Sequence, residues 1–391
     1  MFKILTLNNI SVKGLQRLPR ERYEVASEMS QPDGVLVRSF KMHDMEIPST
    51  VAAIGRAGAG VNNIPIDAMT QRGVPVFNAP GANANAVKEL AIAGLLMASR
   101  NIPTAMRFAS GLEGTDREVS AAVESGKKNF VGAELPSKTL GVIGLGAIGL
   151  RVANAALSLG MKVVGYDPLI SVQSAWQLSS GVEQAVSVDH LFSQCDAVSV
   201  HVPLLDATKG LVNAERINMM PKGSILVNLA RGGICDDDAV LAALDSGHLL
   251  SYIIDFPTGQ LLSHSKVISF PHLGASTEEA EENCAVMVSD SLRDYLEDGT
   301  VRNSVNFPEA YMPRNGGARI TIANANVPNM VGQISTILAN AGLNIADLLN
   351  KSRGEVAYTI IDLDGGIDDE TLSSIRNTEG VLSLRHLPQA S

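Results

Sequence analysis

The sequence predicts an α/β protein built on parallel sheets, followed by a small α+β module near the C-terminal end. Two observations predict the parallel sheets. Short apolar runs alternate with helix-like stretches in the first part of the chain, and a second series of the same kind starts at Thr139. The third observation is a change of pattern after residue 317, where the order of strands and helices no longer fits a parallel sheet.

The first series contains short buried strands separated by helix-like stretches and by turns rich in Gly and Asn. Its strands are expected at residues 3–7, Val35–Val37, Val51–Ile54 and Val74–Phe77. Residues 86–99 follow as a long apolar helix, and the more polar residues 110–137 predict an arm. Because strands connected through helices run parallel, this part predicts a first parallel sheet.

The second series predicts a doubly wound parallel sheet with helices on both faces. Its strands are expected at Leu140–Ile143, Lys162–Gly165, Ala197–His201, Ser224–Asn228, Tyr252–Ile254 and Val267–Ser269. A helix over residues 277–298 follows, with Thr277 as its N-cap.

The last part of the chain begins with residues 304–317, whose Pro, Gly and Asn predict a linker. A separate α+β module is then expected, because strand and helix patterns alternate over a length typical of a small domain. The strands are Arg319–Ile322, Glu355–Leu363 and Val381–Leu387, and the helices are Val331–Ala341 and Asp369–Asn377.

Composition excludes several classes of function. The formal net charge of −10 on 391 residues repels a nucleic-acid backbone, so no nucleic acid is expected as a partner. Three widely spaced cysteines, Cys195, Cys235 and Cys284, fit neither a disulfide framework nor a metal site, so no metal is expected. The chain starts as a strand and has no apolar run of about 20 residues, which predicts a cytoplasmic protein without a membrane span.

A glycine-rich turn carries the strongest functional signal. Gly144, Gly146 and Gly149, with Ala147 and Ile148 among them, follow a predicted strand and open a predicted helix. This spacing is typical of a dinucleotide site, in which the backbone approaches the pyrophosphate and the helix N-terminus binds it. Asp167 ends the next strand, where an acid binds the ribose 2′-hydroxyl and repels a 2′-phosphate. The sequence therefore predicts NAD as the cofactor.

Three further segments, together with this turn, resemble the D-isomer-specific 2-hydroxyacid dehydrogenases in order and spacing. They are His201–Pro203, Val227–Gly233 and Pro271–Thr277. The resemblance covers essentially the whole chain. It implies a Rossmann-type nucleotide-binding domain (93–276) inserted in a flavodoxin-like substrate-binding domain (1–92 and 277–303), then the linker (304–317) and a C-terminal module that resembles an ACT domain (318–391).

The resemblance implies roles for two residues. Arg231 would hold the substrate carboxylate and polarise its carbonyl, which suits a planar guanidinium. His272 would accept the hydroxyl proton, because imidazole titrates near working pH. The remaining cofactor contacts implied by the resemblance are His201, Pro203, Thr208, Ala230, Asp255, His272 and Gly274.

The sequence departs from the family at one place. The family usually has a Glu that bonds the catalytic imidazole, whereas this chain has Gly259 and Gln260 at the matching position. Neither side chain supplies a negative charge. We therefore expect a weakened acid–base pair or a replacement acid from elsewhere in the fold.

The resemblance also implies a substrate end and a regulatory end. The substrate contacts would be Arg38, Ser39, Lys41, Ala59, Gly60, Val61, Asn83 and Arg231. The implied substrate is 3-phosphoglycerate or a similar small acid. A glycerate- or lactate-type acid, or a catalytically weak NAD-sensing protein, remains an alternative. Asn326 and Asn344 would hold L-serine as an effector in a homodimer or homotetramer, the alternative being a module that only pairs subunits.

Overall fold

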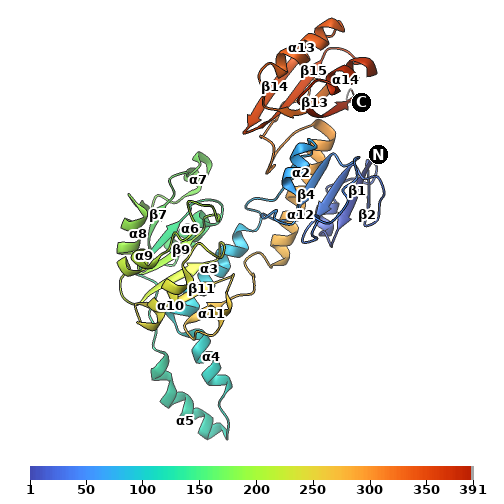
Figure 1. Ribbon diagram of the computed structural model, residues 1–391. Helices are drawn as coiled ribbons and strands as arrows, with labels where there is room; N and C mark the ends of the chain where they lie inside the picture. Colours follow the sequence, from blue (N-terminus) through green and yellow to red (C-terminus); the bar gives the residue numbers. More distant parts are fainter. Residues whose placement is uncertain (389–391) are drawn as a thin grey trace. The chain divides into compact units, whose positions relative to one another are not determined.

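The computed structural model describes residues 1–388. It divides into two compact units, which are described separately (Figure 1). The inserted unit is Ala84–Thr277, and the flanking unit joins Met1–Asn83 to Glu278–Ser391. The helix that the sequence predicts over residues 86–99 lies wholly in the inserted unit.

The inserted unit contains a parallel sheet of seven strands in the order β12-β11-β10-β9-β6-β7-β8. This order is that of a doubly wound nucleotide-binding fold, which confirms the predicted class. Its strands are β6 (Thr139–Ile143), β7 (Lys162–Tyr166), β8 (Val182–Gln184), β9 (Ala197–Val200), β10 (Ser224–Asn228), β11 (Leu249–Ile254) and β12 (Val267–Ser269).

Helices cover both faces of this sheet because successive residues of a strand point to opposite sides. Val227 of β10 packs in the core formed with α3 and α6, and its neighbour Leu226 packs in the core formed with α8, α9 and α10. The helices of the unit are α3 (Ala84–Ser99), α4 (Ile102–Ser110), α5 (Asp116–Gly126), η1 (Lys127–Phe130), α6 (Gly149–Ser158), α7 (Val172–Gln177), α8 (Val188–Gln194), α9 (Ala214–Met219), α10 (Asp237–Asp245) and α11 (Gly259–Leu262). Figure 1 shows α4 and α5 extending away from the sheet of this unit. The arm predicted at residues 110–137 contains α5 and η1, whereas α4 begins before it.

The flanking unit contains a second parallel sheet, in the order β2-β1-β3-β4-β5. This is the flavodoxin-like order that the resemblance implies. Its strands are β1 (Phe2–Leu7), β2 (Tyr23–Ala26), β3 (Gly34–Val37), β4 (Ala53–Arg56) and β5 (Val76–Phe77), and its helices are α1 (Val12–Leu15), α2 (Ile66–Gln71) and α12 (Glu278–Asp298). Gly55 lets α12 lie close to the sheet, since a Cβ there would be 2.8 Å from Val288 Cγ2.

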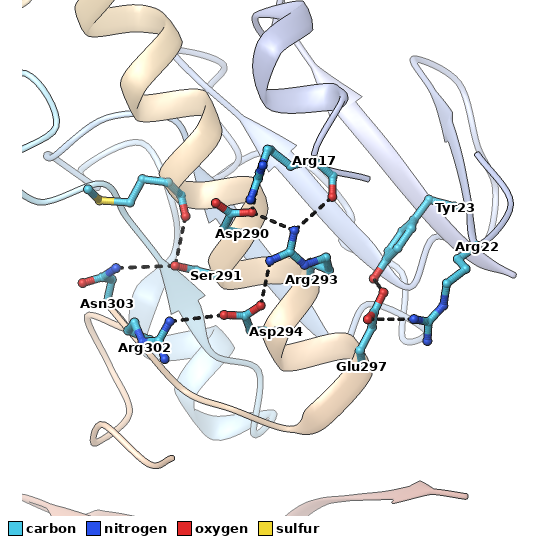
Figure 2. Close-up of polar contacts among 11 residues, drawn as sticks. Arg17, Arg22, Tyr23, Asp290, Ser291, Arg293, Asp294, Glu297, Arg302 and Asn303 are labelled. Atoms are coloured by element: carbon cyan, nitrogen blue, oxygen red, sulfur yellow. Dashed lines mark hydrogen bonds and ion pairs between the residues drawn. The ribbon is translucent and has the colours of Figure 1, made fainter. Parts of the chain in front are cut away.

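Helix α12 is also attached to the N-terminal part of the unit by charged side chains (Figure 2). Arg17 donates to Asp290 at 2.8 Å, and Arg22 donates to Glu297 at 2.9 Å. The Tyr23 hydroxyl donates to the same Glu297 at 2.7 Å. These contacts fix a helix that comes from a distant part of the sequence onto the segment between α1 and the start of β2.

The C-terminal module has the element order βαββαβ and an antiparallel sheet in the order β14-β15-β13-β16. Its elements are β13 (Ala318–Ala325), α13 (Met330–Asn340), β14 (Ile345–Arg353), β15 (Val356–Leu363), α14 (Asp369–Arg376) and β16 (Val381–Leu387). One face of the sheet packs on α13 and α14 through residues such as Ile361. On the other face, Tyr358 packs in the core with Tyr295 and Phe307.

A buried ion pair connects this module to the end of α12. Arg319 is fully buried and donates to both carboxylate oxygens of Asp362, at 2.6 and 2.7 Å. Its guanidinium also donates to the carbonyl oxygens of Asp298, Met312 and Pro313. All N–H groups of the Arg319 guanidinium therefore donate to an oxygen. A buried charge is tolerated when it is hydrogen-bonded in this way.

Part of the predicted linker packs against the flanking sheet. Val305 donates its amide to Val76, and Asn306 accepts from the Val76 amide and donates to Val74. Phe307 is fully buried. Residues 304–307 thus cover the open edge of β5.

The predicted strands of both parallel sheets are present, and the structure adds β2, β8 and β14, which the sequence pattern did not reveal. Among residues 1–388 no helix is both long and apolar enough to cross a membrane.

Candidate functional site

The glycine-rich turn connects β6 to α6. Gly144 has φ 87°, a conformation that favours glycine. A Cβ at Gly149 would lie 1.8 Å from the Gly144 oxygen, so this position also requires glycine. A Cβ at Gly146 would meet no atom within 4 Å, which leaves the space that a pyrophosphate needs above the backbone.

The surroundings of this turn fit a dinucleotide. Ile148, the N-cap of α6, supplies no side-chain cap, so the helix N-terminus keeps its affinity for an anion. Asp167 accepts from the amides of Leu145 and Leu169, at 2.8 and 2.9 Å. These bonds fix the carboxylate beside the turn, at the predicted position for the ribose.

The loop after β10 presents Arg231, which is exposed. The buried Asn228 holds this loop, because its Nδ2 donates to the Arg231 oxygen at 2.8 Å and its Oδ1 accepts from the Ala230 amide at 3.1 Å. The Arg231 guanidinium donates to the Ala230 oxygen at 2.6 Å. The backbone is fixed while the guanidinium stays accessible to a carboxylate.

The segment after β12 presents His272, which is also exposed and has φ 55°. Asp255, almost fully buried, fixes this segment by accepting three amides. Its carbonyl accepts from His272 at 3.1 Å, and its carboxylate accepts from Leu273 and Gly274 at 2.6 and 2.8 Å. Asp255 therefore has a structural role here, and its predicted contact to the cofactor stays a prediction.

The segment after β9 contains the remaining predicted cofactor contacts. The Nε2 of His201 bonds Ser199 Oγ at 2.8 Å, and burial lowers the pKa of His201 to about 4. The ring is therefore neutral at working pH. Thr208 closes the loop after Pro203, since its hydroxyl donates to the Pro203 oxygen and accepts from the Leu205 amide at 2.8 Å.

In the flanking unit, the predicted substrate contacts Arg38, Ser39 and Lys41 lie in one loop after β3. Asn8, which follows β1, accepts from the Ser39 amide at 3.1 Å. Asn63 donates to the Arg38 oxygen at 3.3 Å. Arg38 itself forms an ion pair with Glu281 in the first turn of α12, where both side chains are about 40% exposed.

The predicted substrate loop, Ala59, Gly60 and Val61, follows β4. Asn78 donates to the Ala59 oxygen at 2.6 Å and fixes its position. A Cβ at Gly58 would overlap Arg56, 1.6 Å from its Nη1, so glycine allows the Arg56 side chain to cross this loop. Asn83, the last residue before the inserted unit, is half-buried.

The predicted effector residues of the C-terminal module are both exposed. Asn326 donates to the Gly354 oxygen at 2.9 Å. Asn344 donates to the Asp364 carboxylate, and its own side-chain oxygen remains an acceptor. Among residues 1–388, no cluster of His, Cys, Asp or Glu suits a metal ion.

Sequence reasoning missed several residues that shape the site. Asn228 lies inside a recognised segment, but its role depends on which backbone groups it reaches. Asn8 and Arg56 lie at or just beyond strand ends of the flanking sheet, where functional side chains gather, and Asn63 lies further along the loop after β4. The ring of Phe256, which contacts His272 and Arg231, carried no signal, because these contacts depend on two loops that meet only in the fold.

The chain was compared with protein families and known proteins. Residues 93–274 match the NAD-binding domain of the D-isomer specific 2-hydroxyacid dehydrogenases. The chain is 34% identical to the D-3-phosphoglycerate dehydrogenase of Haemophilus influenzae, over 88% of this chain and 83% of that protein. It is 37% identical to the enzyme of the same name from Rattus norvegicus, over 78% of this chain and 56% of that longer protein.

A solved structure agrees with this assignment. The NAD+-bound 3-phosphoglycerate dehydrogenase of Entamoeba histolytica matches with a TM-score of 0.58 and 28% identity, over 78% of this chain and 98% of that one. The similarity thus extends over the glycine-rich turn and over the segments that carry Arg231 and His272. The chain belongs to the D-isomer-specific 2-hydroxyacid dehydrogenase family and is an NAD-dependent enzyme of that family.

Proposed function

We propose that this enzyme oxidises 3-phospho-D-glycerate to 3-phosphooxypyruvate with NAD, the first step of L-serine biosynthesis. The observation that carries the proposal is the identity of at least one third to D-3-phosphoglycerate dehydrogenases over most of the chain. Arg231 and His272 stand in the segments that resemble the family. Free, buried cysteines suit a reducing compartment, so we place the reaction in the cytoplasm.

The chemistry follows from the two exposed side chains of the inserted unit. Arg231 binds the substrate carboxylate through its planar guanidinium and polarises the oxygen of the forming carbonyl. His272 accepts the hydroxyl proton as the carbonyl forms. Bound NAD supplies the acceptor for the hydride that leaves the same carbon. In the reverse direction, protonated His272 returns the proton.

The loop of Arg38, Ser39 and Lys41 is proposed to bind the substrate phosphate, with Asn83 as a further polar contact. Support comes from the side chains Asn8 and Asn63, which hold this loop in place. Backbone amides in the loop Ala59–Val61 are proposed to bind the carboxylate. Arg38 pairs with the partly exposed Glu281. Because an ion pair of this kind is weak, Arg38 can exchange Glu281 for the substrate phosphate.

Replacing Arg38 by Ala is expected to lower kcat/KM for 3-phosphoglycerate about 10-fold to 100-fold, the worth of one charge-assisted contact to phosphate. kcat/KM for glycerate, which has no phosphate, should change little. Steady-state NADH formation with both substrates measures the ratio. Arg22→Ala is the matched control, because Arg22 also pairs with a Glu of α12. An equal loss on both substrates would contradict the assignment of Arg38 to the phosphate.

We further propose that the C-terminal module is an ACT domain that binds L-serine and pairs subunits in a homodimer or homotetramer. Its βαββαβ order supports this, as does the free acceptor oxygen of Asn344 beside the Asp364 carboxylate, which together suit an ammonium group. Serine should inhibit NADH formation, and Asn344→Ala should weaken inhibition about 10-fold without changing kcat. The exposed Asn340 provides the control variant; inhibition unchanged in Asn344→Ala would refute this site.

A further inference from the structure

The ring of Phe256 contacts both side chains to which the chemistry has been assigned. Phe256 directly follows Asp255 and is half-buried. Its ring centroid lies 4.6 Å from that of the His272 imidazole, with the two planes inclined by 50°. The Arg231 guanidinium carbon lies over the same ring, 5.6 Å from its centroid. One aromatic side chain therefore bridges a cation and an imidazole that come from different loops.

No carboxylate within the inserted unit connects Arg231 to His272 in this way. Across residues 84–277, neither Arg231 nor the His272 ring forms an ion pair or a side-chain hydrogen bond with an acid. Gly259 carries no side chain, and Gln260 is exposed on α11. The sequence predicts either a weakened acid–base pair or a replacement acid. Within residues 84–277 the structure shows no replacement acid beside His272.

The backbone at both positions is already fixed, so what remains to be set is the direction of each side chain. Asp255 accepts the amides of His272 and its two successors, and Asn228 holds the loop of Arg231. Both functional side chains are otherwise exposed. The face of Phe256 limits the orientations of each through an aromatic contact and a cation–π contact.

We propose that Phe256 is a positioning residue whose ring orients Arg231 and His272 together. The inference rests on the proposed roles of Arg231 and His272. The guanidinium is attracted to the face of the ring, and the imidazole packs against the same ring as an aromatic partner. The ring therefore fixes the direction of both side chains without supplying a net charge.

The test compares Phe256→Leu, which keeps an apolar side chain and loses the ring, with Phe256→Tyr, which keeps the ring. Phe256→Leu is expected to lower kcat roughly tenfold, because two aromatic contacts are lost together. KM for 3-phosphoglycerate should rise as well, since Arg231 is no longer directed by the ring, whereas the affinity for NADH should stay close to wild type. Phe256→Tyr should retain the wild-type kcat and KM.

Two controls keep the result interpretable. Phe130→Leu removes a ring from a similar aromatic pair, 5.2 Å from Phe108 in the arm, and should leave kcat and KM unchanged. Binding of NADH, followed by energy transfer from Trp176, the single Trp of the chain, checks that each variant is folded. Phe256→Met repeats the test if the Leu variant fails this check.

The outcomes separate the inference from the function on which it rests. Suppose that wild-type protein forms NADH and that His272→Asn abolishes this activity. If Phe256→Leu then matches wild type in kcat and KM, the inference about Phe256 alone is overturned. It is also overturned if Phe256→Tyr loses as much as Phe256→Leu. If wild-type protein forms no NADH from any 2-hydroxy acid, the proposed function and this inference fail together.

Discussion

Replacing His272 by Asn is expected to lower kcat for oxidation by roughly 10²-fold to 10⁴-fold, the usual contribution of a positioned general base. Asn is the suitable substitute, because it tolerates the left-handed backbone conformation that His272 adopts at φ 55°. Affinity for NADH should stay close to wild type, since Asp255 continues to hold the segment by its backbone amides. Steady-state kinetics and energy transfer from Trp176 measure the two quantities separately.

The control for this variant is His190→Asn, an exposed histidine on α8 of the same unit. It should leave kcat unchanged. A His272→Asn enzyme that retains more than about one tenth of the wild-type kcat would contradict the role of His272 as base, given the range expected for such a group.

Replacing Asp362 by Ala is expected to lower the free energy of unfolding of the C-terminal module by about 3–5 kcal/mol. The reason is that Arg319, fully buried, loses its charge partner while remaining cationic. Hydrogen exchange of the β13 and β15 amides measures the local opening free energy in the intact chain. The inserted unit provides an internal reference, because exchange of the amides of its buried strands β6 and β9 is measured in the same experiment.

A surface pair supplies the comparison for this effect. Lys13 and Glu282 also form an ion pair in the flanking unit, but the Lys13 side chain is 63% exposed. Glu282→Ala should therefore lower the free energy of unfolding far less than Asp362→Ala does. If Asp362→Ala costs no more than Glu282→Ala, the buried pair does not stabilise the attachment of the module as described.

The parts of this protein that could be predicted from sequence are those whose physical requirement is local. The spacing of Gly144, Gly146 and Gly149 reflects a turn conformation and two close approaches, which the structure contains. Buried strands were predictable because both faces of a parallel sheet are apolar. Asp167 was predictable because it ends the strand that follows this turn.

The parts that could not be predicted have weak local patterns or depend on the fold. Strand β8 is short and half-exposed, and β14 is an edge strand with mostly exposed residues, so neither shows a buried apolar run. Asn306 lies in a stretch that looks like a linker, yet its side-chain oxygen accepts from the Val76 amide at the edge of β5. The contacts of Phe256 with Arg231 and His272 require two separate loops to meet.

The central claim, that this chain oxidises a small 2-hydroxy acid with NAD, is tested most directly by NADH formation from purified full-length protein. We predict that 3-phosphoglycerate supports NADH formation with NAD, that NADP replaces NAD poorly because Asp167 repels a 2′-phosphate, and that glycerate is a weaker substrate. Absence of NADH formation with 3-phosphoglycerate, glycerate and lactate alike would contradict the account. Retention of NADH binding in that case would favour a protein that senses NAD without turning it over.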